Sequence, residues 1–121
     1  MSGPLQYKWF FESTTPVEGH MHAIARTIST LQTKFQFMEI FETHSYGKVL
    51  VLDGRIQSSQ HDEFIYHEVL VQPGLLAHPR PRSAMVIGGG EGATVREILR
   101  HPTITDCLMV DIDGEVVEEC K

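Results

Sequence analysis

The sequence predicts two folds in succession: a small N-terminal antiparallel β domain of the α+β type, then the first β-α-β unit of an α/β nucleotide-binding sheet. Short segments rich in β-branched and aromatic residues fill the first half of the chain. After a proline-rich connector, apolar strand-like runs alternate with helix-like segments, which is typical of a parallel sheet. The first of these runs ends in a glycine cluster at residues 88–92, and the second ends on the acid Asp111.

The length and composition of the chain are those of about one folded domain. It has 121 residues, with 10 basic and 16 acidic side chains and a net charge of -6. A nucleic-acid-binding protein usually presents a basic face, so we expect no nucleic-acid partner. We find neither an apolar run of membrane-spanning length nor a signal peptide, so we expect no membrane contact and a cytoplasmic location. The two cysteines are expected to be reduced.

The first half is predicted to form a meander of three or four antiparallel strands. Asp53-Gly54 is a strong signal for a two-residue hairpin, and Tyr46-Gly47 indicates a second turn. The edges and apolar faces of such a small sheet need covering, so we expect it to pack on another subunit or domain. The expected strands are residues 22–29, 34–43, 48–52 and 55–58.

Residues 62–76 are predicted to be helical, because an acidic start favours a helix N-terminus and apolar residues follow at near-helical spacing. Pro73-Gly74 is expected to interrupt or end this helix. The prolines at 79 and 81 stiffen the connector, which we take as the domain boundary. Residues 1–78 then form the β domain with its helix, and residues 79–121 begin the α/β domain. The apolar residues at helical spacing are Ile65, Val69 and Leu76.

Beyond the boundary, strands are expected at residues 83–87 and 105–110, and helices at 91–100 and from 114 onward. A doubly wound sheet needs more than two strands to bury its faces. We therefore expect this sequence to be the front part of a longer, here truncated, fold.

The glycine cluster is predicted to approach a ligand, since glycine lets the backbone turn tightly without a Cβ in the way. Its spacing is G-x-G-x-G and not the dinucleotide fingerprint G-x-G-x-x-G, and a plain strand-to-helix turn is the alternative. Asp111 lies about 20 residues further on, where an acid can accept hydrogen bonds from a ribose diol. Asp113 is predicted to cap the helix that follows.

Glu91 lies inside the glycine turn, where its charge would repel a phosphate. A positively charged ligand suits this position, so the sulfonium of an S-adenosyl compound fits better than NAD. The alternative is that Glu91 only complements the dipole of the following helix.

Two histidine groups are less decisive. His20 and His22 place two imidazoles on one face of a strand, but no third ligand has a diagnostic spacing, so we predict no metal site. Tyr66 and His67 are adjacent on the predicted helix, and two interpretations are equally open. They are either a core tyrosine with a hydrogen-bonded histidine, or residues that bind a ligand.

Four segments, at residues 47–57, 62–68, 88–92 and 110–113, closely resemble the polyamine aminopropyltransferases, which include the spermidine, spermine and thermospermine synthases. The resemblance covers nearly all of residues 7–121. It implies an N-terminal β domain that makes a homodimer or homotetramer, and a methyltransferase-like Rossmann domain. The family transfers an aminopropyl group from decarboxylated S-adenosylmethionine to an amine such as putrescine, without a cofactor, and releases methylthioadenosine.

The resemblance also implies roles for individual residues. Glu91 stands where most spermidine synthases have aspartate, which is similar to the thermospermine synthase branch. The catalytic aspartate of the family lies in a later Asp-Ser-x-Asp motif that this sequence lacks, so we expect no catalytic residue here and no activity from residues 1–121 alone. The implied cosubstrate contacts are Gln36, Gly88, Gly90, Glu91 and Asp111, and the implied amine contacts are Tyr66, His67 and Glu91.

Two alternatives stay open. An S-adenosylmethionine-dependent methyltransferase shares the glycine turn and the ribose acid, although the hairpin at residues 47–57 and the helix at 62–68 argue against it. A non-catalytic, truncated homologue would only oligomerise through its β half.

Overall fold

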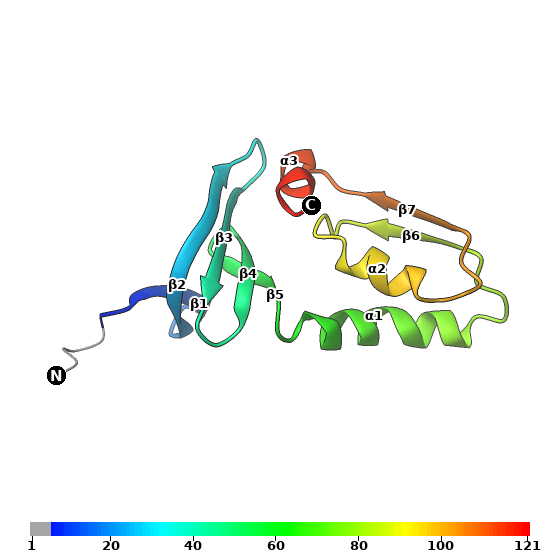
Figure 1. Cartoon of the computed structure of the whole chain (residues 1–121), viewed down its shortest axis with the longest axis horizontal. Coiled ribbons are helices and arrows are strands. Elements are labelled where there is room, and N and C mark those ends of the chain that lie inside the picture. The colour runs from blue at the N-terminus through cyan, green and yellow to red at the C-terminus, as the bar shows by residue number, and fades with distance from the viewer. Residues whose placement is uncertain (1–5) are drawn as a thin grey trace. The chain divides into compact units, whose positions relative to one another are not determined.

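The computed structural model describes residues 6–121 and divides them into two compact units. The β unit holds residues up to 32 and residues 36–62, and the α/β unit holds residues 33–35 and 63–121. Figure 1 labels the elements of each unit.

The β unit is one antiparallel sheet of five strands in the order β1-β2-β3-β4-β5. The strand β2 is 15 residues long, and two register shifts in its ladder with β3 mark irregular points along it. The bounds are β1 Lys8–Thr15, β2 Glu18–Gln32, β3 Phe37–Thr43, β4 Gly47–Leu52 and β5 Arg55–Ser59.

The turns of this sheet follow the predicted chemistry. Asp53 and Gly54 have φ of 49° and 76°, so both central residues of the β4–β5 hairpin lie in the left-handed region that a tight two-residue turn requires. The predicted hairpin is confirmed. The sheet has five strands, whereas three or four were expected, and the strand that was not predicted is β1. The second half of β1 is polar, so its sequence does not show the apolar pattern of a strand; backbone pairing with β2 holds it in the sheet.

All five strands contribute to the core of the β unit. Phe41, Val49 and Val51 from β3 and β4 are almost completely buried. Side chains from the other three strands pack against them, namely Phe10, Ile24 and Ile56.

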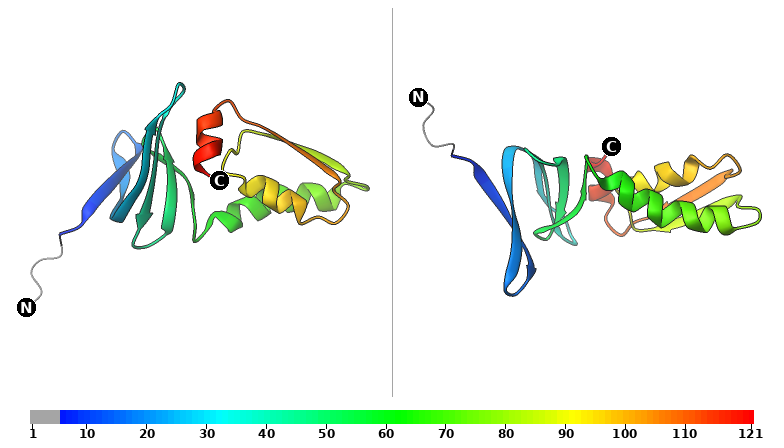
Figure 2. Two further views of the ribbon diagram at one scale, coloured as in Figure 1. Left: turned by 45° about the horizontal axis from the view of Figure 1, so that its top comes forward. Right: turned by 90° about the horizontal axis from the view of Figure 1, so that it is seen from below.

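The α/β unit pairs the strands β6 (Ser83–Ile87) and β7 (Asp106–Val110) in parallel, in the same register throughout. The helices α1 (Glu63–Ala77) and α2 (Ala93–Leu99) lie side by side, as Figures 1 and 2 both show, and α3 spans Gly114–Glu119. The predicted β-α-β unit is therefore confirmed.

One face of the β6–β7 pair is buried and the other is open. Val86 from β6 packs with Val71 from α1 and Ile98 from α2 to form the core of the unit. The alternate strand residues face away from this core and are exposed, which follows from the period of two in a strand. These exposed residues are Met85, Ile87, Leu108 and Val110.

The helix α1 belongs to the α/β unit, because Val71 is part of that unit's core. The division therefore falls between residues 62 and 63, whereas the sequence analysis placed it between residues 78 and 79. A proline-rich connector marks a stiff segment, but the packing of the helix decides where the units divide.

The helix α1 also differs from its prediction in two respects. It continues through Pro73 to Ala77, since the packing of Val71 and Leu75 offsets the backbone hydrogen bond that proline removes. Its buried residues are His67 and Val71, whereas the predicted apolar residues are more than half exposed. The helix is 15 residues long, and within residues 6–121 no helix is long and apolar enough to cross a membrane.

Candidate functional site

The glycine turn between β6 and α2 depends on glycine for its backbone conformation. Gly88, Gly89 and Gly92 have φ of 84°, 77° and 82°, in the left-handed region that side chains with a Cβ rarely adopt. The N–H of Gly88 donates to the carbonyl of Val110 at 2.7 Å, which fastens the turn to the end of β7. The turn thus lies at the carboxyl ends of both parallel strands, where ligands bind in open α/β sheets.

Gly90 is required for space. A Cβ on this residue would lie 2.9 Å from Val117 Cγ2 and 3.0 Å from Asp111 Oδ2. Its N–H donates to the same Asp111 oxygen at 2.9 Å. The close approach that the sequence analysis assigned to a ligand is therefore made, at this position, by the carboxylate of Asp111.

Asp111 joins two loops through its two carboxylate oxygens. Oδ2 accepts from Gly90, and Oδ1 accepts from the N–H of Asp113 at 2.9 Å. Each carboxylate oxygen has a second lone pair, so the group can still accept hydrogen bonds from the hydroxyls of a ribose. The carboxylate of Asp111, which is predicted to bind a ribose, is thus held in place by backbone N–H groups.

Asp113 caps α3, as predicted. Its side chain accepts from the N–H groups of Glu115 and Val116 at the start of the helix. The hydroxyl of Thr33 donates to its other oxygen at 2.6 Å, and Asp113 is only 1% exposed. This last hydrogen bond fastens residues 33–35 to the α/β unit, and the sequence analysis did not foresee it.

His67 holds the carboxylate of Glu91. Its Nε2 lies 2.9 Å from Glu91 Oε1, and its Nδ1 lies 2.7 Å from both the carbonyl oxygen and Oε2 of Glu63. A carbonyl oxygen only accepts, so Nδ1 carries a hydrogen. His67 is 2% exposed, whereas the side chain of Glu91 is 19% exposed.

Glu63 is in turn fixed by Arg96 from α2, with 2.8 Å between the guanidinium and the carboxylate. The hydrogen bond from Arg96 is the main reason that the pKa of Glu63 lies below its usual value of 4.5; burial opposes this, and the hydrogen bond from His67 adds to it. Glu63 in the same way raises the pKa of Arg96. Arg96 also contacts Glu97 on its own helix, which is 1% exposed. The ion pair of Glu63 with Arg96 joins α1 to α2.

Two further side chains lie near these groups. Tyr66 is exposed on α1, and its ring stands edge-on to His67 with 5.1 Å between centroids. Partial burial raises the pKa of the Cys120 thiol, and the negative charges of Glu91 and Asp111 raise it further. Cys120 is a free thiol, as the sequence analysis expected.

The structure brings most of the predicted residues into one unit. The α/β unit contains two contacting pairs, His67 with Glu91 and Gly90 with Asp111. Gln36 belongs to the β unit, where it is half-buried and directly precedes β3. Their binding roles stay predictions. Glu63, Arg96 and Thr33 were not among the residues predicted from the sequence, although the spacing of four residues between Glu63 and His67 on a helix is a signal for their contact.

The strand, glycine turn, helix and second strand ending on an acid define the class: an α/β sheet of the Rossmann type. The model of the spermidine synthase tetramerisation domain matches residues 8–60, and that of the spermine/spermidine synthase domain matches residues 63–121. The chain belongs to the spermidine synthase family, the polyamine aminopropyltransferases.

Curated relatives and solved structures agree with this assignment. The chain is 47% identical to a polyamine aminopropyltransferase of Sulfurisphaera tokodaii over 96% of its length and 39% of the relative's. It is 46% identical to polyamine aminopropyltransferase 2 of Pseudomonas aeruginosa over 91% of its length and 32% of the relative's. The chain thus spans well under half of these relatives.

The crystal structure of spermidine synthase from Thermotoga maritima matches with a TM-score of 0.93 and 36% identity, over 98% of this chain and 42% of that one. A spermidine synthase in complex with the transition-state analogue AdoDATO matches with the same TM-score and identity, over 98% and 41%. None of these four proteins is named a thermospermine synthase, so that branch stays a prediction.

The contact of Gly90 with Asp111 predicts a steric effect. Gly90→Ala should lower the free energy of unfolding by about 1–3 kcal/mol, because its Cβ overlaps Val117 and Asp111. Gly114→Ala is the matched control, since nothing lies within 4 Å of its Cβ, and it should be neutral or stabilising. Urea unfolding of both variants measures the difference, and equal stabilities would contradict the steric account.

The pair of Glu63 and Arg96 predicts a dependence of stability on pH. The folded pKa of Glu63 lies below 4.5, so the pair stabilises the fold above that pH and loses its effect as the pH falls through the folded pKa. Arg96→Met should cost about 0.5–1 kcal/mol at pH 7, since Arg96 is half exposed, and progressively less as the pH falls through the lowered pKa of Glu63. Arg80→Met on the connector is the control. A cost for Arg96→Met that does not change as the pH falls would refute the assignment.

Proposed function

We propose that the protein is an aminopropyltransferase that uses decarboxylated S-adenosylmethionine and an amine such as putrescine or a related polyamine. The observation that carries this proposal is the carboxylate of Glu91, held by His67 inside the glycine turn of a spermidine synthase domain. The likeness to a spermidine synthase crystallised with a transition-state analogue supports it.

The charges of the site support a cationic cosubstrate. A carboxylate in the turn would repel the phosphates of a dinucleotide and attract a sulfonium. In this proposal Asp111 accepts the ribose hydroxyls with its remaining lone pairs, while Gly88 and Gly90 contact the nucleoside. Tyr66, His67 and Glu91 bind the amine, whose positive charges Glu91 also attracts.

The proposed reaction is an in-line displacement. An uncharged amine nitrogen attacks the carbon next to the sulfonium, a C–N bond forms, and the electron pair of the broken C–S bond goes to sulfur. The leaving group is the neutral thioether methylthioadenosine, which needs neither protonation nor a metal or redox cofactor. The protein has to align the two reactants and accept one proton from the amine.

The proton acceptor of the family lies in an Asp-Ser-x-Asp motif that residues 1–121 do not contain. We propose that these residues hold the reactants but do not turn them over without that motif. A cytoplasmic location and the lack of a nucleic-acid partner stay predictions.

The reaction type is tested by the choice of donor and acceptor. The intact protein should transfer an aminopropyl group from decarboxylated S-adenosylmethionine, with putrescine, spermidine and agmatine offered in competition and the products separated by chromatography. Glu91→Gln should raise KM at least tenfold, or about 1.4 kcal/mol, and Glu115→Gln on α3 should not. Methyl transfer from S-adenosylmethionine would show a methyltransferase instead, and no transfer of either kind would show a non-catalytic homologue.

We further propose that the β unit forms a homodimer or homotetramer through the outer face of β1 and β2. Phe11 pairs with Met21 across this ladder, and both are 59% exposed, while Trp9 on the same face is 52% exposed. Phe10, on the opposite face, packs into the core. Three large apolar side chains on one face of an edge hairpin favour an interface, and the matching family model is described as a tetramerisation domain.

The proposed interface predicts a change of mass. Phe11→Glu places a charge in the apolar patch and should shift the protein to a smaller species in size-exclusion chromatography with light scattering. Val17→Glu, at a residue that is 89% exposed, is the control and should leave the mass unchanged. An unchanged mass for Phe11→Glu would place the interface elsewhere.

A further inference from the structure

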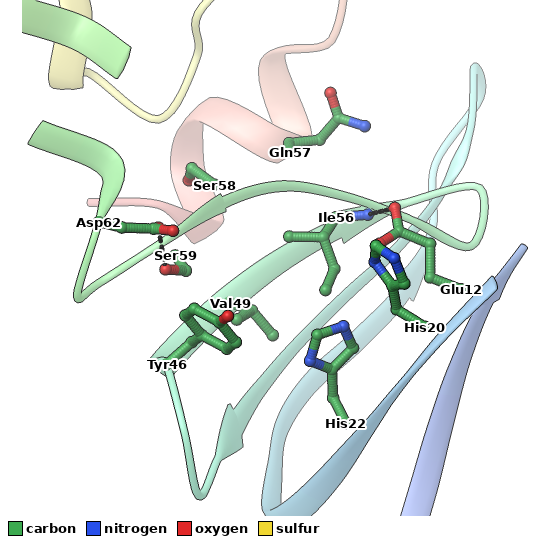
Figure 3. Close-up of a pocket in the computed structure, with 10 residues that line it drawn as sticks. All are labelled: Glu12, His20, His22, Tyr46, Val49, Ile56, Gln57, Ser58, Ser59 and Asp62. Atoms are coloured by element: carbon green, nitrogen blue, oxygen red, sulfur yellow. Dashed lines mark hydrogen bonds between the residues drawn. The ribbon is translucent and has the colours of Figure 1, made fainter. Parts of the chain in front are cut away.

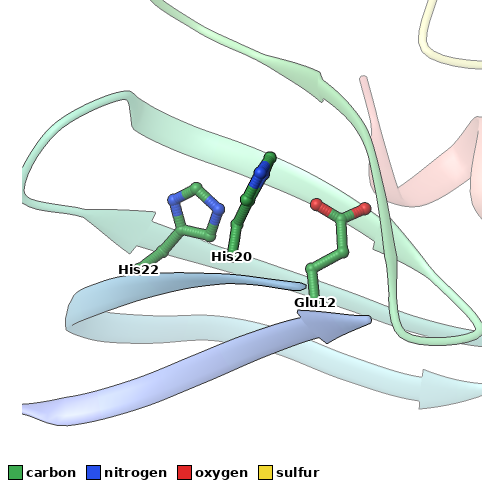
Figure 4. A group of neighbouring side chains, drawn as sticks. All are labelled: Glu12, His20 and His22. Carbon is green, nitrogen blue, oxygen red and sulfur yellow. The ribbon is translucent and has the colours of Figure 1, made fainter. Parts of the chain in front are cut away.

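Three side chains of the types that can bind a metal ion lie together on one face of the β1–β2 ladder. Glu12 of β1 is directly opposite His20 of β2, and His22 is two residues further along β2, so all three project from the same face. One ligand atom from each residue lies within 4.8 Å of the other two. Figure 4 shows the two imidazoles and the carboxylate side by side.

The contacts of these residues leave their ligand atoms available. Among the described residues, neither imidazole makes a hydrogen bond; the ring of His22 only lies against the rings of Phe10 and Tyr46, at 6.5 and 5.7 Å between centroids. Glu12 uses one oxygen to accept from the N–H of Ile56 at 2.9 Å, which fixes the orientation of its carboxylate.

The three side chains line a cavity of about 280 Å³ in the β unit. Figure 3 shows them on one side of it, with Tyr46 and Ser58 also on its wall. The cavity has room for an ion with bound water, and polar groups line part of it. His20 is exposed and Glu12 is half-buried, so an ion can reach the ligands from solvent.

We propose that Glu12, His20 and His22 bind one divalent transition-metal ion of the Zn²⁺ type, with water completing its coordination. Two imidazole nitrogens and one carboxylate oxygen are ligands that Zn²⁺, Co²⁺ and Ni²⁺ accept, whereas Mg²⁺ and Ca²⁺ prefer oxygen ligands alone. Tetrahedral ligands at the usual bond lengths are about 3.4 Å apart, so side-chain rotations that shorten the distances between the three ligand atoms by at most about 1.4 Å bring them into place.

The position of the site gives the ion a structural role. The strands β1 and β5 are the two edges of the sheet. Glu12 already connects them through the N–H of Ile56, and an ion bound to Glu12 would tie this junction to β2 as well. The ion takes no part in the proposed aminopropyl transfer, which requires none.

The sequence analysis found two of these ligands and predicted no metal site. The third, Glu12, lies eight residues before His20, and only the antiparallel register of β1 with β2 brings the two together.

Titration of the metal-free intact protein with Co²⁺ tests the proposal, since ligand-field absorption in the visible region reports the coordination directly. We expect one equivalent to bind with bands of a four- or five-coordinate nitrogen and oxygen site. Glu12→Gln, His20→Ala and His22→Ala should each weaken binding at least tenfold, and His44→Gln, elsewhere in the β unit, should not. Zn²⁺ should displace Co²⁺ and raise the thermal midpoint of the native protein alone.

Glu12→Gln keeps an oxygen that can accept from Ile56, so this variant separates loss of the ligand from loss of the fold. Far-UV circular dichroism in the presence of EDTA confirms the fold of each variant. The proposal is overturned if the native protein binds no Co²⁺, or if the three variants bind it as tightly as the native protein does.

Discussion

The contact between His67 and Glu91 is the interaction on which the site depends. It fixes a carboxylate inside the glycine turn, where we propose that a positively charged cosubstrate binds. Within the α/β unit, Val71 of α1 packs with Val86 and Ile98, which places the buried His67 of the same helix next to the turn. Glu63, itself paired with Arg96, holds the other side of the imidazole, so three side chains from α1 and α2 position one charge.

The second half of the site is built from the backbone around Asp111. Its two oxygens accept from Gly90 and Asp113, and Asp113 in turn caps α3 and accepts from Thr33. A carboxylate held at both oxygens loses little freedom when a ligand binds, which lowers the entropic cost of binding. Gly90 therefore makes room for a hydrogen bond within the protein, in addition to the proposed role of the glycine turn in ligand binding.

Parts of the fold and of the candidate site could be predicted from short stretches of sequence. The Asp53-Gly54 hairpin, the cap at Asp113 and the strand at residues 83–87 each depend on residues that are close in sequence, and the structure confirms them. Contacts between distant segments were not predictable in this way. The contact of His67 with Glu91, the bond of Thr33 to Asp113 and the position of Glu12 opposite His20 depend on packing and register, which the periodicity of side chains does not specify.

The central claim is that Glu91 recognises the positive charge of the cosubstrate. Calorimetry with decarboxylated S-adenosylmethionine and with its uncharged counterpart, methylthioadenosine, tests this claim most directly, since both share the nucleoside that Asp111 is proposed to bind. The intact protein should bind the sulfonium compound more tightly, and Glu91→Gln should remove most of that preference while leaving the affinity for methylthioadenosine nearly unchanged. An equal preference in the native protein and in the variant would contradict the account.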